Sequence, residues 1–436
     1  MWVAYAYPKD ISMTTTIRSI VTSISLALIS QSAMAAAFGL NEHSATGLGR
    51  AFAGEAAIAD NAAVLARNPA AMSLFSRPEI SVAGTYVKPN IDLKGRENLQ
   101  VGSSTIPASS LDANNIASDG FIPEAYYIQP LSKQFAWGLA LFTNYGLATE
   151  FPTDYILGPI AGKSELTTVN INPNFSYALN EQWSIGAGVS AIYADATLIR
   201  RAGLLANYNS KLSSSTAIAD LTGDTWGWGW NVGTLYKLNA DNRWGLTYRS
   251  GSTLSFDGQF IGITSGFNQV PGHLDLELPA IAEFSGYHKL QEKFALHYSV
   301  QWTGWDVFKE LKATGNQCSQ GVCFNKQQDF SDSWRYALGA SYYLSPTWTL
   351  RSGIALDQQA ANNVISIPDT QRLWYSAGAT YQSTSTWSLD FGVAYLDGKA
   401  VDINEPMTIS GLGSVTTKYS SQASALIVSA QANYRF

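Results

Sequence analysis

Residues 387–395 read WSLDFGVAY, and apolar or aromatic residues alternate there with small or polar ones. Because successive side chains of a β-strand point to opposite faces, this stretch predicts a strand with one apolar face and one small, polar face. The same alternation recurs in three further stretches, residues 226–232, 294–302 and 426–436. The pattern predicts an all-β fold whose strands separate an apolar environment from a polar one.

The composition narrows the class of protein. The chain has 436 residues, of which 46% are hydrophobic and 14% are charged, well below the roughly 25% charged residues of ordinary soluble domains. This content is too apolar for a disordered chain and too poor in charge for an ordinary soluble enzyme. A helical membrane protein is excluded as well, since only one apolar stretch, near the N-terminus, approaches spanning length.

The connections between the expected strands distinguish a membrane barrel from a soluble sandwich, whose strands would also alternate. Many strands begin or end with an aromatic residue, as in the aromatic girdles at the two membrane interfaces. Six connections are short, and each is followed within a few residues by Phe or Trp: residues 132–134, 180–182, 239–243, 291–293, 345–347 and 383–386. Short periplasmic turns opposite long, polar outer loops are typical of bacterial outer-membrane barrels.

The short turns also predict the number of strands. If both ends of the wall face the periplasm, six turns join seven up-and-down pairs, which makes 14 strands. Closure is required because every backbone N–H and C=O in hydrocarbon must be paired. The last residue, Phe436, resembles the C-terminal signal of outer-membrane proteins. We therefore expect an all-β membrane protein with a 14-stranded antiparallel transmembrane β-barrel, whose strands start near residues 79, 123, 135, 166, 183, 225, 243, 276, 293, 333, 347, 370, 386 and 420.

The N-terminus has the features of a secretory signal. Arg18 supplies a positive charge, residues 20–29 are apolar, and residues 33–35 form an A-x-A cleavage site. We expect a signal peptide over residues 1–35, with Met13 as the more natural start. A permanent membrane helix is the alternative, which the shortness of the apolar run disfavours.

Residues 36–77 lack strand alternation and are predicted to form a separate N-terminal segment. Residues 51–65 are rich in alanine, which favours short helix, and Asn68-Pro69 marks a helix stop and a turn. The segment is too short for an independent domain. We expect it to fill the lumen of a barrel formed by residues 78–436, because a 14-stranded barrel leaves a hole unless it is plugged.

Charge and cysteine content limit the partners and cofactors. The formal net charge is −6 and Lys and Arg form no cluster, so nucleic-acid binding has little support. The four histidines have no metal-ligand spacing, and we expect no metal and no cofactor. Cys318 and Cys323 lie five residues apart in a polar segment. In an exported protein they predict a small disulfide loop, with two free loop thiols as the alternative.

Motifs spread along the chain carry a resemblance to a known family. In the N-terminal segment they are LNEHS at 40–44, GLGRA at 47–51, IAD at 58–60 and RNPA at 67–70. Further along they are NYGLATEF at 144–151, WGWGWN at 226–231, LTYRS at 246–250 and SIPD at 366–369. Together they resemble the long-chain fatty acid transporter family of Gram-negative outer membranes (FadL family). The resemblance covers essentially the whole mature chain.

The resemblance implies a monomeric outer-membrane transporter and not an enzyme. Its partners would be long-chain fatty acids, similar detergent-like amphiphiles and outer-membrane lipid. In that family a fatty acid first lands on an apolar groove between two outer loops and then moves to a tighter internal site. It leaves sideways when the N-terminal segment, called the hatch, shifts. The exit is a gap in the barrel wall where the third strand kinks inward.

The resemblance also maps the exit and the hatch onto particular residues. The kink corresponds to Asn144, Tyr145 and Gly146, and glycine suits a bulge there because it accepts a positive φ. From the residues alone, a strand end before an ordinary loop is equally compatible. A hatch motif is expected to fix the hatch beside the kink, with a plain helix-ending turn as the alternative; it comprises Asn68, Pro69 and Ala70.

The low-affinity groove maps to apolar residues in two outer loops that are otherwise polar. A lipid ligand would explain these residues, and so would mutual packing. They are Leu204, Leu205, Tyr208 and Leu212 in one loop and Ile261, Ile263 and Phe267 in the other.

The internal site requires a cation for the carboxylate and an apolar slot for the tail. The family's headgroup positions correspond to Arg200 and Lys326, and Phe38 is expected to touch the tail from the hatch side. Taken alone, the two basic residues would be solvated loop charges, and the neighbouring Arg201 leaves the register at Arg200 open.

Three other functions fit parts of the sequence. A general porin would need a lumen lined by charge, which the low charge content and the N-terminal segment disfavour. An outer-membrane hydrolase would need a serine nucleophile paired with a histidine, and the sequence has no Gly-x-Ser-x-Gly elbow. An importer of other hydrophobic compounds, such as aromatic hydrocarbons, is the remaining alternative, although the two basic residues favour an anionic headgroup.

Overall fold

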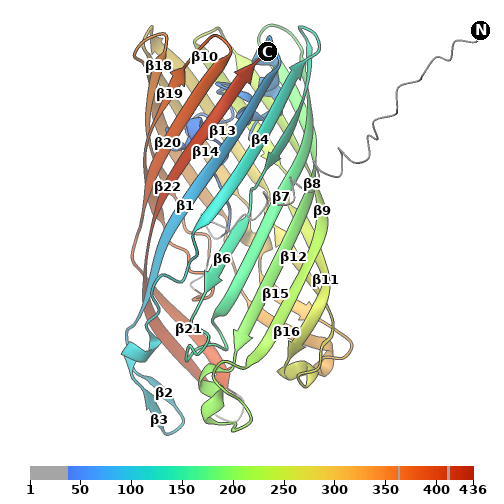
Figure 1. Ribbon diagram of the computed structural model, residues 1–436, viewed down its shortest axis with the longest axis vertical. Helices are drawn as coiled ribbons and strands as arrows, with labels where there is room; N and C mark the ends of the chain where they lie inside the picture. The colour runs from blue at the N-terminus through green and yellow to red at the C-terminus, as the bar shows by residue number, and fades with distance from the viewer. Residues whose placement is uncertain (1–37, 362–363, 410–412) are drawn as a thin grey trace, which may run out of the picture.

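The computed structural model describes residues 38–361, 364–409 and 413–436, which form one closed antiparallel β-barrel (Figure 1). The expected signal peptide, residues 1–35, lies outside the described residues. Among the residues that the structure describes, no helix is both long and apolar enough to cross a membrane.

Fourteen strands form the barrel wall, which confirms the predicted number. The ring closes where β1 pairs with β22 in an unbroken register from Glu79↔Arg435 to Gly95↔Tyr419. One wall strand consists of two parts, β5 and β6. The wall strands are β1 (Glu79–Gly95), β4 (Gly120–Pro130), β5 (Phe135–Phe142) with β6 (Gly146–Glu150), β7 (Gly162–Ala178), β8 (Trp183–Arg201), β9 (Ala217–Lys237), β10 (Asn242–Arg249), β13 (Ile281–Gln291), β14 (Phe294–Thr303), β17 (Ser333–Tyr343), β18 (Trp348–Asp357), β19 (Arg372–Gln382), β20 (Trp387–Gly398) and β22 (Gly413–Arg435).

Most predicted strand starts lie within a few residues of the observed ones, and three differ for a physical reason. β9 begins at Ala217 and β22 at Gly413, earlier than the expected starts, because both strands continue beyond the alternating stretch into the outer loops. The start expected near residue 276 falls in a loop strand, β12 (Val270–Leu278), and the wall strand β13 begins at Ile281.

Short turns and long loops lie at opposite ends of the barrel (Figure 1). The six turns occupy the end that also holds the start of β1 and the C-terminus, where Phe436 N donates to Pro78 O. The loop end carries a disulfide between Cys318 and Cys323. It also carries β2 (Leu99–Val101), β3 (Ser104–Ile106), β11 (Ser252–Gly262), β12, β15 (Glu310–Thr314), β16 (Val322–Gln327), β21 (Val401–Ile409) and the short helices η3 (Ala108–Leu111), η4 (Gly203–Asn207), η5 (Ile263–Ser265), η6 (Trp305–Val307) and η7 (Ser319–Gly321).

The wall turns its large apolar side chains outward and its polar side chains inward. On β20, Trp387 and Phe391 are exposed, whereas Ser388 and Asp390 between them are buried in the lumen. Trp228 on β9 is 69% exposed. Such an outer surface would be costly in water and is stable in hydrocarbon, so the alternation reflects a lipid-facing wall.

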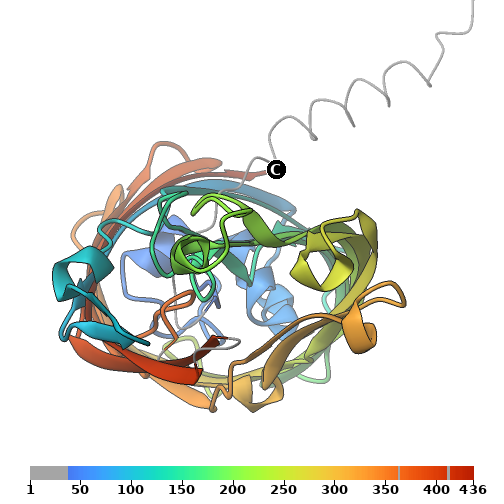
Figure 2. The same cartoon turned by 90° about the horizontal axis from the view of Figure 1, so that it is seen from below.

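Residues 38–75, which we call the lumen segment, lie inside the ring (Figure 2), and Ser76 and Arg77 after them are exposed. The lumen segment contains α2 (Ala45–Leu48), η1 (Ala62–Ala66) and η2 (Pro69–Leu74), so the helix favoured over residues 51–65 forms only at its C-terminal end. Ala51 and Phe52 have positive φ angles, which interrupt helix. Backbone groups there bond to wall side chains instead: Gly54 N donates to Ser299 Oγ at 2.8 Å, and Arg335 Nη2 donates to Ala51 O at 2.8 Å.

Wall glycines leave room for this segment. A Cβ on Gly353 would lie 2.2 Å from the carbonyl oxygen of Arg50, and one on Gly392 would lie 2.5 Å from that of Ala45. Charged wall residues hold the segment as well, since Asp60 lies 3.0 Å from Arg50 and 3.1 Å from Arg351 of β18. The glycine content of the inward face therefore follows from close contact between two backbones.

Replacing Gly353 by valine should destabilise the folded protein by about 1–3 kcal/mol, the usual cost of overpacking. The new side chain would overlap the Arg50 carbonyl. Ser352→Val is the matched control, because residue 352 is exposed on the opposite face of β18. Urea unfolding followed by tryptophan fluorescence measures both variants, and an equal loss in the two would contradict the role assigned to Gly353.

Candidate functional site

The barrel wall is interrupted between β4 and β5. The ladder between these strands runs from Pro130↔Ala136 to Ala125↔Leu141 and ends there. Within the described ranges, residues 120–124 of β4 have a ladder partner in β1 but none in β5. We call the interval between residues 120–124 and residues 143–146 the wall window. Pro123 lies in this one-sided part of β4, where the missing N–H of proline is tolerated.

The strand on the other side of the window contains a bulge. Phe142 pairs with Asn170 of β7, and Gly146 pairs with Thr167, so the stretch from 142 to 146 carries one residue more than its partner. Asn144, Tyr145 and Gly146 lie in this bulge. Gly146 is not among the described glycines with positive φ. The kink is therefore produced by the extra residue in the strand, and a left-handed glycine is not involved.

The N-terminal segment supplies the hydrogen bonds that the kinked residues lose. Leu40 N donates to Asn144 O at 2.6 Å, and Gly146 N donates to Phe38 O at 2.8 Å. The side chain of Asn144 contacts the ring of His43 at 3.2 Å. The kinked strand is therefore paired inward with the lumen segment over a stretch where it is not paired with its wall neighbour.

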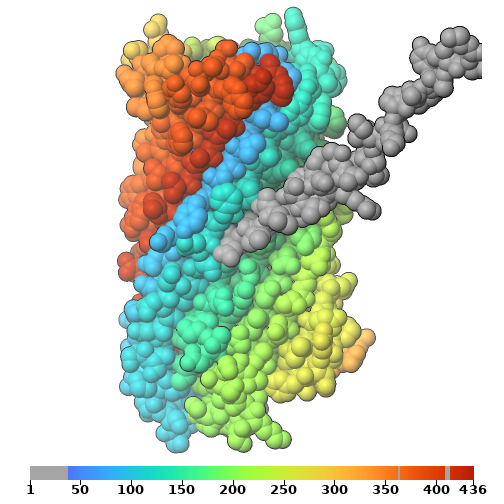
Figure 3. All heavy atoms as spheres, in the orientation of Figure 1, coloured from blue at the N-terminus to red at the C-terminus, as the bar shows by residue number. Residues whose placement is uncertain are grey.

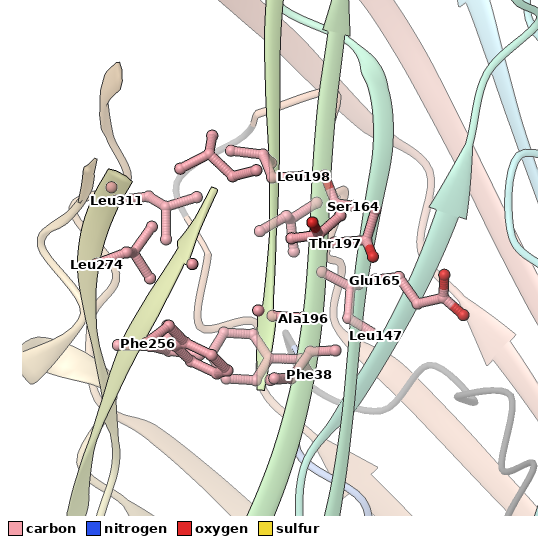
Figure 4. A pocket seen from close by; sticks show the side chains of 18 of the residues that line it. Phe38, Leu147, Ser164, Glu165, Ala196, Thr197, Leu198, Phe256, Leu274 and Leu311 are labelled. Atoms are coloured by element: carbon pink, nitrogen blue, oxygen red, sulfur yellow. The ribbon is translucent and has the colours of Figure 1, made fainter. Parts of the chain in front are cut away.

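A cavity lies between the wall and the loop strands at the loop end (Figure 4). Leu274 and Leu311 lie on one side of it and Ala196 and Leu198 on the other, while Phe38 and Phe256 lie at one end. Most of the lining is apolar, and Arg200 is the basic residue in it. An apolar space with a basic residue in its lining suits an amphiphile with an anionic headgroup.

Phe38 connects the cavity with the wall window. Its ring packs against Trp305, Phe308 and Tyr145, with centroid distances of 4.5, 5.3 and 6.2 Å. Phe38 lines the cavity with its side chain, and its carbonyl bonds to the kink at Gly146. A displacement of Phe38 would therefore disturb both places.

Arg200 is 2% exposed, at the outer end of β8. Its guanidinium donates to Lys163 O at 3.0 Å, Ile199 O at 2.9 Å and Ser164 Oγ at 3.2 Å, which are all neutral acceptors. Its buried Nε–H has no hydrogen-bond partner. Arg200 thus forms no direct ion pair with any described residue, although the charge of Glu405 acts on it from farther away. Its spare donor lies beside an apolar cavity, which suits the binding of a carboxylate.

Lys326 lies close to Arg200 but does not line the cavity. Its ammonium is 2.7 Å from Glu405 Oε1, and it donates to Ile160 O and Ser366 Oγ, both at 3.0 Å. Burial lowers the pKa of Lys326, and the charge of Glu405 opposes this shift. The structure therefore places the two expected headgroup residues near each other, with Arg200 in the cavity lining and Lys326 outside it, paired with Glu405.

The expected groove residues occupy the outer loops with unequal exposure. Leu204 is buried and packs with the cluster around the cavity, whereas Tyr208, Ile263 and Phe267 are exposed. Leu205, Leu212 and Ile261 are half-buried. They come from the loops that contain η4 and η5, which lie at the loop end in Figure 2.

The hatch motif forms a helix start as well as a helix end. The Asn68 side chain accepts from Ala70 N at 2.9 Å and caps η2, which begins at Pro69. The Asn68 amide donates to Ala56 O and to Thr234 O of β9. These bonds tie two parts of the lumen segment to the wall at β9.

Sequence reasoning missed the residues that make up most of the cavity. Leu198, Phe256, Leu274 and Leu311 come from four different strands, and each is one member of an ordinary alternating pattern. It also missed Glu405. For the four apolar residues, the signal in the sequence was an apolar side chain near the outer end of a strand or in an outer loop.

Comparison with known proteins identifies relatives over nearly the whole chain. Residues 26–436 match the family described as "Outer membrane protein transport protein (OMPP1/FadL/TodX)". The "Long-chain fatty acid transport protein" of Escherichia coli O6:H1 is 38% identical, over 95% of this chain and 97% of that protein. Two crystal structures share the fold: a Pseudomonas aeruginosa FadL homologue (TM-score 0.79, 20% identity, 92% and 99% coverage) and the Pseudomonas putida toluene transporter TodX (TM-score 0.67, 16% identity, 92% and 100% coverage).

Filling the cavity should weaken the binding of apolar ligands. We expect Leu198→Trp to lower the affinity for the neutral fluorescent probe 1-N-phenylnaphthylamine by about tenfold, or about 1.4 kcal/mol. Ile199→Trp is the control, because residue 199 points to the other face of β8. Fluorescence titration of the purified variants measures the affinities; equal binding by Leu198→Trp and the unsubstituted protein would place the probe elsewhere.

Proposed function

The chain belongs to the family of outer membrane transport proteins (OMPP1/FadL/TodX), and from this membership we propose that it takes up long-chain fatty acids. The family consists of outer-membrane transporters and channels and not of enzymes. The chain is accordingly a multi-pass outer-membrane protein that takes up hydrophobic compounds. The finer proposal, that the compound is a fatty acid, depends on the headgroup end of the cavity.

The buried guanidinium of Arg200 carries this proposal. A charge that is 2% exposed, bonded to neutral acceptors and left with a free Nε–H, is costly unless an anion joins it. The apolar cavity next to it offers the alkyl chain a place away from water. A fatty acid supplies both the carboxylate and the chain.

The proposed route has three steps, namely capture at the outer loops, binding in the cavity and lateral exit. The exposed apolar residues Tyr208, Ile263 and Phe267 receive the ligand at the outer loops, and the cavity beside Arg200 binds it. The described part of the predicted hatch, residues 38–77, acts as the hatch. Movement of Phe38 opens the way from the cavity to the wall window, and the ligand leaves sideways into the membrane. The shared contact of Phe38 with cavity and kink supports this coupling.

Import of neutral aromatic hydrocarbons is the second candidate, because the chain shares its fold with the toluene transporter TodX. A neutral hydrocarbon would leave the charge of Arg200 buried without an anion. The apolar lining alone suits either ligand, so the role of Arg200 decides between the two functions.

Removing the guanidinium should weaken the binding of anionic ligands selectively. Hydrogen bonds to charged groups contribute about 1.5–3 kcal/mol, so we expect Arg200→Ala to bind oleate roughly 10- to 100-fold more weakly and oleyl alcohol unchanged. Arg201→Ala is the matched control, because Arg201 points outward and donates to Ser215 O in an exposed position. Isothermal titration on the purified proteins tests this, and unaltered oleate affinity in Arg200→Ala would reject the fatty-acid assignment.

Removing the bulge should close the wall window. Deletion of Asn144 takes out the one extra residue, so that the strand can stay in register with β7 and continue its ladder with β4. We expect uptake of radiolabelled oleate by cells to fall at least tenfold while oleate binding persists. Asn144→Ala keeps the bulge and should transport normally; a deletion variant with normal uptake would argue against lateral exit.

A further inference from the structure

Glu405 is a buried acidic residue on β21 that the proposed route does not use. Its Oε1 lies 2.7 Å from Lys326 Nζ, and its Oε2 accepts a hydrogen bond from Ile365 N at 2.8 Å. Both side chains of the ion pair are largely buried, with 6% exposure for Glu405 and 12% for Lys326. The carboxylate is thus held at both oxygens, next to the headgroup end of the cavity.

In this arrangement Lys326 has no donor left for a ligand. An ammonium group has three N–H donors. The three acceptors around Lys326 Nζ are Glu405, the carbonyl of Ile160 and the hydroxyl of Ser366. Glu405 therefore occupies the position that a ligand carboxylate would need in order to bind Lys326.

Arg200 differs from Lys326 in its direct partners, although the charge of Glu405 acts on both residues. Within the described ranges its hydrogen-bond acceptors are neutral, its Nε–H is unpartnered, and it lines the cavity. Phe324, which precedes Lys326 by two residues on β16, lies 5.9 Å from the Arg200 guanidinium. β16 thus places the paired cation Lys326 near Arg200 of β8, which has no direct ion-pair partner among the described residues.

Another ion pair lies at this end of the cavity. Lys163 and Glu165 are 2.7 Å apart, and Glu165 is the acidic residue in the cavity lining. Lys326 is paired with Glu405 and Lys163 with Glu165, whereas Arg200 forms no direct ion pair with any described residue.

We propose that Glu405 is a specificity-determining residue, which neutralises Lys326 and restricts the cavity to amphiphiles with a single negative charge. The proposal rests on the proposed function, since it requires a ligand anion at Arg200. A carboxylate carries one charge and is matched by the single free cation. A phosphate monoester carries about 1.5 to 2 negative charges at neutral pH and would bring an unpaired charge into a buried site.

Removal of the Glu405 charge should widen this specificity. We expect purified Glu405→Gln to bind oleyl phosphate about tenfold more tightly than the unsubstituted protein, to gain less for oleate, and to bind oleyl alcohol unchanged. Glu97→Gln is the matched control, because it removes an exposed carboxylate that is paired with Lys418 at 2.9 Å. Unchanged binding of oleyl phosphate by Glu405→Gln would overturn the proposal.

A double substitution separates neutralisation from direct headgroup binding by Lys326. Lys326→Met alone leaves the Glu405 charge unpaired beside the anion site, so oleate binding should weaken. Adding Glu405→Gln removes that charge, and binding should return to within about threefold of the original affinity. If the double variant binds oleate as weakly as Lys326→Met alone, Lys326 binds the headgroup directly and the proposal is wrong.

The two proposals fail in different ways. If Arg200→Ala binds oleate normally, the fatty-acid assignment fails and the role of Glu405 fails with it. If Arg200→Ala weakens oleate binding but Glu405→Gln changes neither anion, the role of Glu405 alone is overturned. Heat-modifiable migration in gels shows for each variant that the barrel is folded, so that a binding change is read only from folded protein.

Discussion

Hydrocarbon offers no hydrogen bonds, and this constraint governs the whole structure. A sheet in lipid has to close, which the pairing of β1 with β22 achieves. At the wall window β4 and the kinked strand separate, so the wall itself leaves backbone groups unpaired there. The backbone of the kink is nevertheless bonded, since Leu40 N and Phe38 O pair with Asn144 O and Gly146 N. The wall can open at this place because the lumen segment provides the partners that the wall does not.

The lipid-facing wall also determines which side chains lie on the inward face of the barrel. Most large apolar side chains of the wall point into the lipid, so the inward face is rich in glycine and polar residues. Those residues receive a lumen segment that makes many of its backbone hydrogen bonds to wall side chains. Inward apolar side chains form two kinds of cluster. Some, such as Trp374 and Ile128, pack against the N-terminal segment, and others near the loop end line the cavity.

The alternation, the aromatic strand ends and the six short turns together were sufficient to predict the barrel and its 14 strands. Lipid imposes a period of two over the membrane part of every strand, and the periplasmic turns are short. The alternation fades where β9 and β22 rise into the loops, and the expected starts near residues 225 and 420 were late there. The helix favoured at residues 51–65 was overridden by hydrogen bonds to the wall, which no local propensity encodes.

The cavity could not be predicted, since Leu198, Phe256 and Leu274 are unremarkable members of separate strands. The pairing of Lys326 with Glu405 depends on how two distant outer loops meet, and distance along the chain carries no sign of it.

The seam between β1 and β22 has a consequence for the order of folding. It joins the first wall strand to the last, Glu79 to Arg435, so the longest loop closure in the chain is also the step that removes the last free edges. A nascent or truncated chain that ends before β22 has two unpaired edges and cannot be stable in lipid. Closure therefore has to follow export of the complete polypeptide, and folding into the membrane is a post-translational event with a high contact order.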